Sequence, residues 1–376
     1  AHVYVNGVKV NGYGTPAPTN PVQRKLYSAY DVAGLLKEGA NCITADAHYL
    51  GGGGQNYVDG KPGFRLELHL VYADGREETI KTDESWDALA EEDMPHEAGT
   101  PYQQNRRISA IERFDARKWD EAWRLPGWSG GARTAKAVPA AEECSAWPMA
   151  RQEIPEGAIA ALLPVRKLEV PADEDNPQIF DAGMIVSGWP RFRLKGVAGA
   201  KVRFRYSENV DERGRVGHNV CNERSDNYYD EYIMRGDAAE EWQPAFSYKA
   251  FRYVEGTGYP LPIAPEDLVV CDAHTGIVPA GSFRCSDEHL NALYDACIRT
   301  QMNNVLGQVV DCPHREQAQY LADTDLQGET LLYNFDAVSV IGKTLDDFAD
   351  MQLDDGSFPF VAPINYRGEF DLQIPE

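Results

Sequence analysis

Hydrophobic and polar positions alternate with a period of two along most of the first 280 residues. Val3-Tyr4-Val5 precedes Asn6-Gly7, and the alternating run 64–70 precedes Asp74-Gly75. An alternating run followed by Asn-Gly or Asp-Gly is typical of a strand that enters a β-hairpin. Further strand-like runs, separated by Gly, Pro and Asp residues, lie at 179–186, 189–194, 201–206, 229–234 and 245–255. Short strands at this spacing favour β-sandwiches over a parallel α/β sheet.

The period changes to about 3.6 residues after Gly281, which predicts helices. Ser286 is expected to cap a first helix whose first turn carries Asp287 and Glu288. Its predicted apolar stripe is Leu290, Leu293, Tyr294, Cys297, Ile298 and Val305. A second helix is expected over Gln317–Asn334, and a third from Asp336. The third has the predicted stripe Val338, Ile341, Leu345 and Phe348. Consecutive helices with short connections indicate helical hairpins.

These patterns predict a multidomain chain with two antiparallel β-sandwich domains followed by helices. The expected domains are 1–138, 139–279 and 280–376. The Pro- and Ala-rich stretch Ala135–Ala141 is the predicted seam between the sandwiches.

The chain is strongly acidic, and this narrows the classes of partner. In 376 residues, 36 Lys and Arg stand against 59 Asp and Glu, a formal net charge of −23. This balance argues against nucleic acid or an anionic membrane as the main partner. No run of 18 apolar residues predicts a membrane span. About half of the charge is local, because residues 311–376 contain 14 acids and three bases.

The seven cysteines are scattered and form no CxxC pair, so they are interpreted as reduced thiols. Reduced thiols favour a cytoplasmic location over a secreted one. The histidines form no HxH or HExxH motif, so no metal centre and no cofactor are predicted. The sequence begins at Ala1 inside a strand-like run and stops at Glu376, so we expect a piece of a longer protein. The oligomeric state is left open, with a homodimer among the alternatives.

The segment 311–323 carries the most informative cluster of polar residues. Pro313 suits the first turn of a helix, and Glu316, Tyr320 and Asp323 are then spaced i, i+4 and i+7. That spacing places two carboxylates and an aromatic ring on one helical face. A solvated acidic face is one interpretation. A functional cluster is the other, and the nearby Asp311 and Arg315 favour it.

Sugar chemistry would use such a cluster. Glycoside hydrolysis needs one protonated carboxyl for the leaving oxygen and one carboxylate for the opposite face of the sugar. Its transition state resembles an oxocarbenium ion, which surplus negative charge stabilises. The acidic balance of residues 311–376 fits a neutral substrate with a cationic transition state and disfavours a phosphorylated one.

The run Asp311-Cys312-Pro313-x-Arg315, with Glu316 next and an Asp seven positions later, resembles the signature of the bacterial α-L-rhamnosidases, glycoside hydrolase family seventy-eight. Other segments resemble the two β-sandwiches and the start of the catalytic barrel of this family. These segments are 4–7, 30–32, 112–117, 180–183, 188–189, 246–255 and 281–287. The resemblance covers nearly the whole chain. It implies that the C-terminal helices open an (α/α) six-hairpin barrel.

The resemblance also implies roles for single residues. Glu316 falls on the family's general acid, and Asp311, Arg315 and Asp323 fall on positions that hold the rhamnose hydroxyls. Tyr320 falls where an aromatic residue lines the −1 subsite. Many members have two acids after the Arg. Here a single acid, Glu316, follows Arg315, and Gln317 comes next. The Glu-to-Asp interval of seven is kept, and we assign the acid by that interval. The family's general base lies late in the barrel, beyond residue 376.

The expected function is therefore inverting hydrolysis of terminal, non-reducing α-L-rhamnose, with a rhamnose-containing glycan or glycoside as partner. On this view residues 1–376 lack the base and are inactive alone. One alternative is a non-catalytic carbohydrate-binding or scaffold protein. Another is an α/α-barrel glycosidase that acts on a different sugar.

Overall fold

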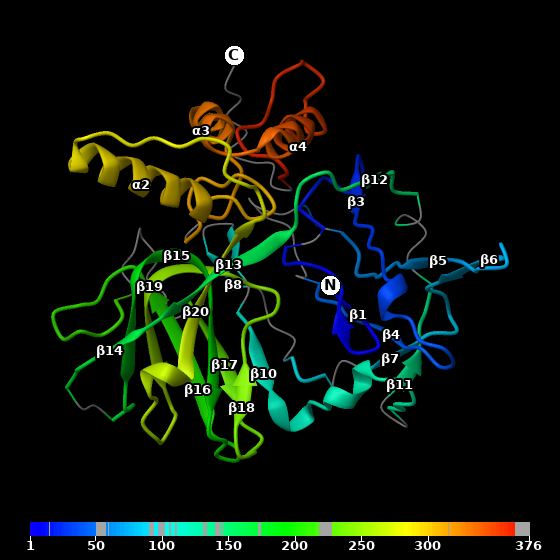
Figure 1. Ribbon diagram of the computed structural model, residues 1–376, viewed down its shortest axis with the longest axis horizontal. Coiled ribbons are helices and arrows are strands. Elements are labelled where there is room, and N and C mark those ends of the chain that lie inside the picture. The colour runs from blue at the N-terminus through cyan, green and yellow to red at the C-terminus, as the bar shows by residue number, and fades with distance from the viewer. Residues whose placement is uncertain are drawn as a thin grey trace.

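A computed structural model describes residues 1–364 except 15, 50–57, 59, 90–93, 97–101, 105–106, 110, 131–133, 140–143, 145, 172–173, 218–227 and 315. In this part the chain is mostly β-structure, with three α-helices towards its C-terminal end (Figure 1). None of the described helices is long and apolar enough to cross a membrane.

The N-terminal part forms several small sheets. Strand β1 (His2–Val5) lies between β2 (Val8–Lys9) and β4 (Ile43–Asp46). Asn6 and Gly7 turn the β1–β2 hairpin with φ angles of 51° and 84°, as the Asn-Gly pair predicts. The second predicted hairpin is also confirmed, by β5 (Glu67–Val71) and β6 (Glu77–Lys81). The other small pairs are β3 (Lys25–Tyr27) with β12 (Met149–Arg151), β7 (Asp87–Leu89) with β11 (Thr134–Lys136), and β8 (Tyr102–Gln104) with β9 (Arg107–Ser109).

A nine-stranded sheet follows, in the order β10-β17-β16-β19-β15-β20-β13, with β14 and β18 paired to β15. Its strands are β10 (Arg113–Asp115), β13 (Gly157–Pro164), β14 (Arg166–Leu168), β15 (Gln178–Leu194), β16 (Lys201–Ser207), β17 (Tyr229–Ile233), β18 (Glu240–Trp242), β19 (Lys249–Thr257) and β20 (Leu268–Thr275). The runs predicted at 179–186 and 189–194 belong to one strand, β15. The pairing is not wholly antiparallel as predicted, because β10 runs parallel to β17 and β12 runs parallel to β3.

The main hydrophobic core is formed mostly by side chains of this sheet. Strand β16 shows how the alternating sequence builds it, because Val202, Phe204 and Tyr206 are buried on one face. The residues between them carry charge and face outward, as a half-buried strand requires. Two pairings cross the predicted boundary at 138/139. Strand β10 extends the large sheet, and β12 pairs back with β3. The boundary itself stays a prediction.

The three described α-helices are α2 (Glu288–Asn303), α3 (Leu321–Asn334) and α4 (Val338–Ala349). Asp287, and not Ser286, caps α2, because its carboxylate accepts hydrogen bonds from the backbone N–H groups of His289 and Leu290. Helix α3 begins four residues later than predicted. Gln317 has a φ of 51°, which a right-handed helix cannot accommodate.

The predicted apolar stripe of α4 is exposed in part. Val338 and Leu345 are 69% and 65% exposed. The buried side chains of α4 are Val340, Lys343, Thr344, Asp347 and Phe348. They follow the same helical period from a different starting position, so the face that packs inward carries polar residues. Leu290 and Leu293 of α2 are likewise 49% and 61% exposed.

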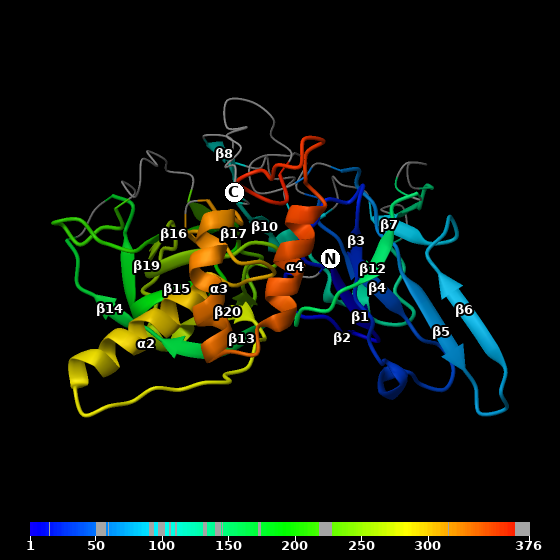
Figure 2. The same ribbon diagram turned by 90° about the horizontal axis from the view of Figure 1, so that it is seen from above.

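The helices pack against both β parts of the chain. Figures 1 and 2 place α2 beside the large sheet, and α4 on the side of the N-terminal strands. Ser187 of β15 donates to the backbone carbonyl of Asn303 at 2.6 Å, and Thr275 N–H donates to Val305 O at 2.8 Å. Arg24 pairs with Asp350 at the end of α4. A shared apolar cluster joins Ala17, Leu26 and Ile154 to Leu331, Phe335 and Val340.

Candidate active site

The segment between α2 and α3 is a loop. Within it, residues 311–312 hydrogen-bond to residues 317–318. Asp311 N–H donates to Ala318 O at 3.0 Å, and Gln317 N–H donates to Cys312 O at 3.0 Å. Residues 319–321 then run alongside 360–362. Gln319 O accepts from Ala362 N–H at 3.1 Å, and Leu321 N–H donates to Phe360 O at 2.9 Å.

This loop contradicts the helical face expected for Glu316, Tyr320 and Asp323. Only Asp323 lies in the helix, in the first turn of α3. Pro313 and Glu316 lie in turns, and Tyr320 is extended and bridged to Val361. The αL backbone at Gln317 reverses the chain direction where the predicted helix should continue. Spacing along a helix therefore does not explain which of these side chains meet.

The loop nevertheless brings Asp311, Cys312, Glu316 and Tyr320 together. The Tyr320 hydroxyl donates to Glu316 Oε2 at 2.5 Å. Ligand atoms of Asp311, Cys312 and Glu316 all lie within 4.8 Å of one another. Glu316 is only 5% exposed, whereas Asp311, Cys312 and Tyr320 are half-buried. A buried carboxylate next to a second, less buried one is an arrangement suited to acid–base chemistry.

Burial raises the pKa of Asp311 to about 6, and the neighbouring charge of Glu316 adds to the rise. Hydrogen bonds from Cys312 and from the backbone N–H of Ala318 oppose it. Two carboxyl groups this close repel each other when both are ionised.

Glutamine side chains hold the loop in place. Gln317 Nε2 donates to Pro313 O at 2.9 Å and to Tyr248 O at 3.3 Å, which ties the turn to the residue before β19. Gln308 Nε2 donates to Gln317 O at 3.1 Å. Gln319, which is 1% exposed, donates to Asp347 Oδ2 at 3.0 Å and accepts from the Thr344 hydroxyl at 2.9 Å. The large sheet and α4 therefore both position the carboxylate cluster.

The remaining predicted site residues are placed differently. Arg315 lies outside the described residues. Asp323 is half-buried, and no hydrogen bond of the described residues joins it to Glu316 or Asp311. His314, which was not predicted, is buried beside the cluster with its ring centroid 4.6 Å from that of Tyr228.

Asp311, Cys312 and Glu316 are also the group of described residues that lies close enough together to hold a metal ion. Two carboxylates and one thiol without histidine are a poor match for a structural or catalytic zinc site. Calcium and magnesium need more oxygen ligands than this group offers. We therefore interpret the cluster as acid–base machinery.

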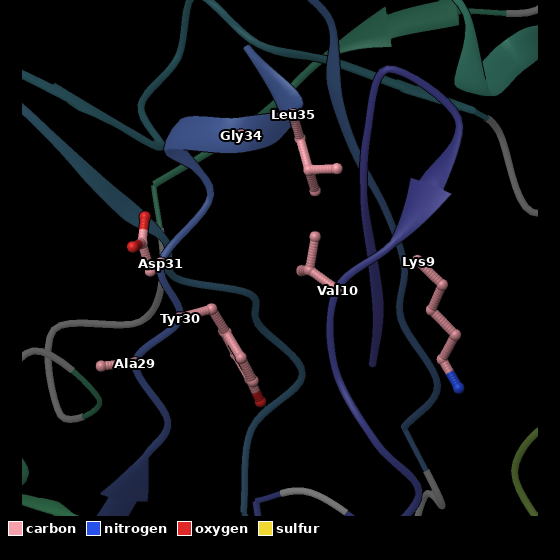
Figure 3. Close-up of a pocket in the computed structure, with 7 residues that line it drawn as sticks. All are labelled: Lys9, Val10, Ala29, Tyr30, Asp31, Gly34 and Leu35. Carbon is pink, nitrogen blue, oxygen red and sulfur yellow. The ribbon is translucent and has the colours of Figure 1, made fainter.

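A separate hollow of about 600 Å³ lies in the N-terminal part, lined by Lys9, Val10, Ala29, Tyr30, Asp31, Gly34 and Leu35. Figure 3 shows Val10 and Leu35 pointing toward each other, while the Asp31 carboxylate points away from them. One carboxylate, that of Asp31, lines this hollow. The loop around Glu316 remains the candidate active site.

Sequence reasoning missed Cys312, Gln317 and Gln319 as neighbours of the carboxylates. Cys312 stands inside the recognised run, and its Sγ accepts from the backbone N–H of Glu316 at 3.4 Å. For the two glutamines no pattern in the sequence gives a signal, because Tyr248, Thr344 and Asp347, which they contact, lie far away in the chain.

Family comparisons match three successive parts of the chain. The α-L-rhamnosidase N-terminal domain matches residues 2–155, and the bacterial α-L-rhamnosidase concanavalin-like domain matches 172–274. The bacterial α-L-rhamnosidase 6 hairpin glycosidase domain matches 279–373, which includes the carboxylate cluster.

Individual proteins give the same picture. The chain is 30% identical over 371 residues to an alpha-L-rhamnosidase of Streptomyces avermitilis, covering 96% of this chain and 34% of that protein. It is 28% identical to an alpha-L-rhamnosidase of Formosa agariphila, covering 93% of this chain and 37% of that protein. The chain therefore spans about a third of the length of these curated relatives.

Solved structures extend the likeness to the fold. The crystal structure of the Streptomyces avermitilis alpha-L-rhamnosidase complexed with L-rhamnose has a TM-score of 0.84 at 27% identity, covering 99% of this chain and 35% of that chain. The alpha-L-rhamnosidase from Dictyoglumus thermophilum has a TM-score of 0.82 at 26% identity, covering 97% of this chain and 40% of that chain.

Proposed function

Because the chain belongs to the bacterial α-L-rhamnosidase family, we propose that it carries the general-acid half of an enzyme that hydrolyses terminal α-L-rhamnosides. The observation that carries the proposal is the Asp311–Glu316 carboxylate pair. It lies in the segment that matches the glycosidase domain of the family.

In this mechanism Glu316 delivers a proton to the glycosidic oxygen as the bond from that oxygen to the anomeric carbon breaks. Glu316 is buried, and the Asp311 carboxylate lies beside it. The positive charge that develops on the sugar ring is stabilised by the surrounding acidic groups. Water then attacks the anomeric carbon from the opposite face.

Activation of that water requires a second carboxylate, placed roughly 6.5–9.5 Å from the acid in an inverting enzyme. Asp311 is not a candidate, because its carboxylate oxygen lies within 4.8 Å of Glu316 and leaves no room for the water. The family resemblance assigns the base to a later part of the barrel than residues 1–376. Asp311, Arg315 and Asp323 are proposed to bind the rhamnose hydroxyls.

At the level of the fold, we propose that the β parts are the two sandwich domains of the family and that α2–α4 open an (α/α) six-hairpin barrel. The exposed leucines of these helices support this proposal, since helices of such a barrel bury apolar faces against further helices. Leu326 at 79% and Leu345 at 65% exposure are the clearest examples.

The test is an assay of the full-length protein and its Glu316→Gln variant on two rhamnosides. One carries a nitrophenol, which leaves without much help. The other is a rhamnosyl disaccharide, whose alkoxide leaves only with a proton. Loss of the general acid should reduce disaccharide cleavage by about 10²–10⁴-fold and nitrophenyl cleavage far less.

Glu78→Gln is the matched control, because it makes the same change at an exposed position of β6. It should leave both rates near wild type. Equal fractional losses on the two substrates in Glu316→Gln would mean that Glu316 binds sugar and another residue donates the proton. Cleavage of an aryl α-L-fucoside or β-glucoside, but not of the rhamnoside, would reject the substrate class.

A further inference from the structure

We propose that Tyr320 is a positioning residue for the general acid, and that its hydroxyl sets the orientation and the proton affinity of the Glu316 carboxyl. The family resemblance assigns this position an aromatic ring that lines the sugar subsite, a role that needs no hydroxyl. The contact that carries the new assignment is the 2.5 Å hydrogen bond from Tyr320 Oη to Glu316 Oε2. The inference rests on the proposed function, because it concerns the same carboxyl.

Tyr320 is held from several sides, so its hydroxyl has a defined place. Its backbone is bridged to Val361, and its carbonyl accepts from Thr324 N–H at 3.0 Å and from the Thr324 hydroxyl at 2.8 Å. Its ring lies 5.7 Å from the ring of Phe360, between centroids, in an apolar cluster with buried Ala318 and Val361. A phenol anchored in this way delivers its O–H to Glu316 with little loss of side-chain entropy.

The hydroxyl acts on the charge balance of the site. A hydrogen bond donated to a carboxylate stabilises the ionised form and makes the acid release its proton more readily. Asp311, Cys312 and Tyr320 are titratable groups that lie close to Glu316.

Removing the hydroxyl should remove this stabilisation of the ionised carboxylate. In Tyr320→Phe the alkaline limb of the pH–rate profile should move to higher pH, by about one pH unit for the loss of one charge-assisted hydrogen bond. The carboxyl also becomes a weaker acid with a less fixed orientation. Cleavage of a rhamnosyl disaccharide should therefore fall about 10-fold, while cleavage of a nitrophenyl rhamnoside changes by less than about 3-fold.

The experiment compares kcat/KM against pH for the full-length wild type, Tyr320→Phe and Tyr320→Trp on both substrates. Tyr320→Trp keeps an aromatic ring but not the positioned hydroxyl, so its alkaline limb should move in the same direction. Tyr72→Phe is the matched control. The Tyr72 hydroxyl donates to Glu78 Oε2 at 2.8 Å, the same chemistry beside the β5–β6 hairpin. This control should leave the pH profile unchanged.

An unchanged alkaline limb in Tyr320→Phe, with equal losses on both substrates or a change in KM alone, would overturn the inference. Tyr320 would then only line the sugar subsite. Failure of the wild type on every rhamnoside would instead reject the proposed function. If the wild type cleaves another glycoside, the same pH comparison on that glycoside still decides the role of Tyr320.

Discussion

Replacing Lys343 by Met should destabilise the helical part of the protein, because it leaves a buried carboxylate without its cation. Lys343 Nζ lies 2.5 Å from Asp347 Oδ2, and the two side chains are 8% and 1% exposed. The same Asp347 oxygen accepts from Gln319 at 3.0 Å. Burial raises the pKa of Asp347, and the charge of Lys343 and its hydrogen bond to Asp347 oppose that rise.

The expected magnitude follows from this burial. Removing one member of a buried ion pair costs about 3–5 kcal/mol, because the remaining charge is desolvated and uncompensated. In a helical domain of 150–250 residues that corresponds to a fall in Tm of roughly 6–20 °C. The loss should be smaller at pH 5 than at pH 8. Without the cation the pKa of Asp347 rises further, so the folded state can take up a proton there, and the stability this provides is lost as pH increases.

The assay is differential scanning calorimetry of the full-length protein at both pH values. Lys136→Met is the matched control, because Lys136 Nζ lies 2.6 Å from Asp87 Oδ1 with both side chains at least 60% exposed. An exposed pair of this kind is worth less than about 1 kcal/mol. The double variant Lys343→Met/Asp347→Leu should recover most of the loss, since it removes both buried charges. Equal Tm shifts in Lys343→Met and Lys136→Met would refute the reasoning.

Three further predictions concern the chemistry of the site. The pKa of Asp311 is raised by burial to about 6, so its stabilising contribution is complete below its unfolded pKa and is lost as pH rises through 6. Asp311→Asn should therefore gain stability relative to wild type as pH rises from about 4 to 7, and urea unfolding at each pH would measure this. Asp323→Asn should lower kcat/KM similarly for good and poor leaving groups, in contrast to Glu316→Gln; a strong dependence on the leaving group would make Asp323 the proton donor. The full-length enzyme should release β-rhamnose first, and initial α-rhamnose in an NMR time course would contradict inversion.

Local sequence patterns predicted the hairpins well. The Asn6-Gly7 and Asp74-Gly75 turns lie where the alternating runs end, because the left-handed backbone of such turns is a local property. Parallel pairing of β10 with β17 was not predictable in this way. Its partners are separated by more than a hundred residues, and nothing in either short strand specifies the other.

The buried face of α4 shows the limits of periodicity more clearly. The apolar period of α4 was recognised, but the polar residues of its buried face were not. Lys343 and Asp347 look like a surface pair at i and i+4, yet they neutralise each other and pack inward. Val338 and Leu345 are hydrophobic and look like core residues, yet they are exposed. Hydrophobicity alone does not indicate which part of the protein covers a side chain.

In the candidate active-site loop, local pattern and distant packing both matter. Helical spacing grouped Glu316, Tyr320 and Asp323, and the structure brings together only the first two, through a turn and not through a helix. Gln317 determines this difference. Its αL backbone ends any helix at that residue, and its side-chain amide bonds to Pro313 O and Tyr248 O, which stabilise the turn. The proposed general acid, Glu316, lies on this loop and is positioned by contacts from the sheet and from α4. Its geometry therefore depends on the packing of parts of the chain that no local motif contains.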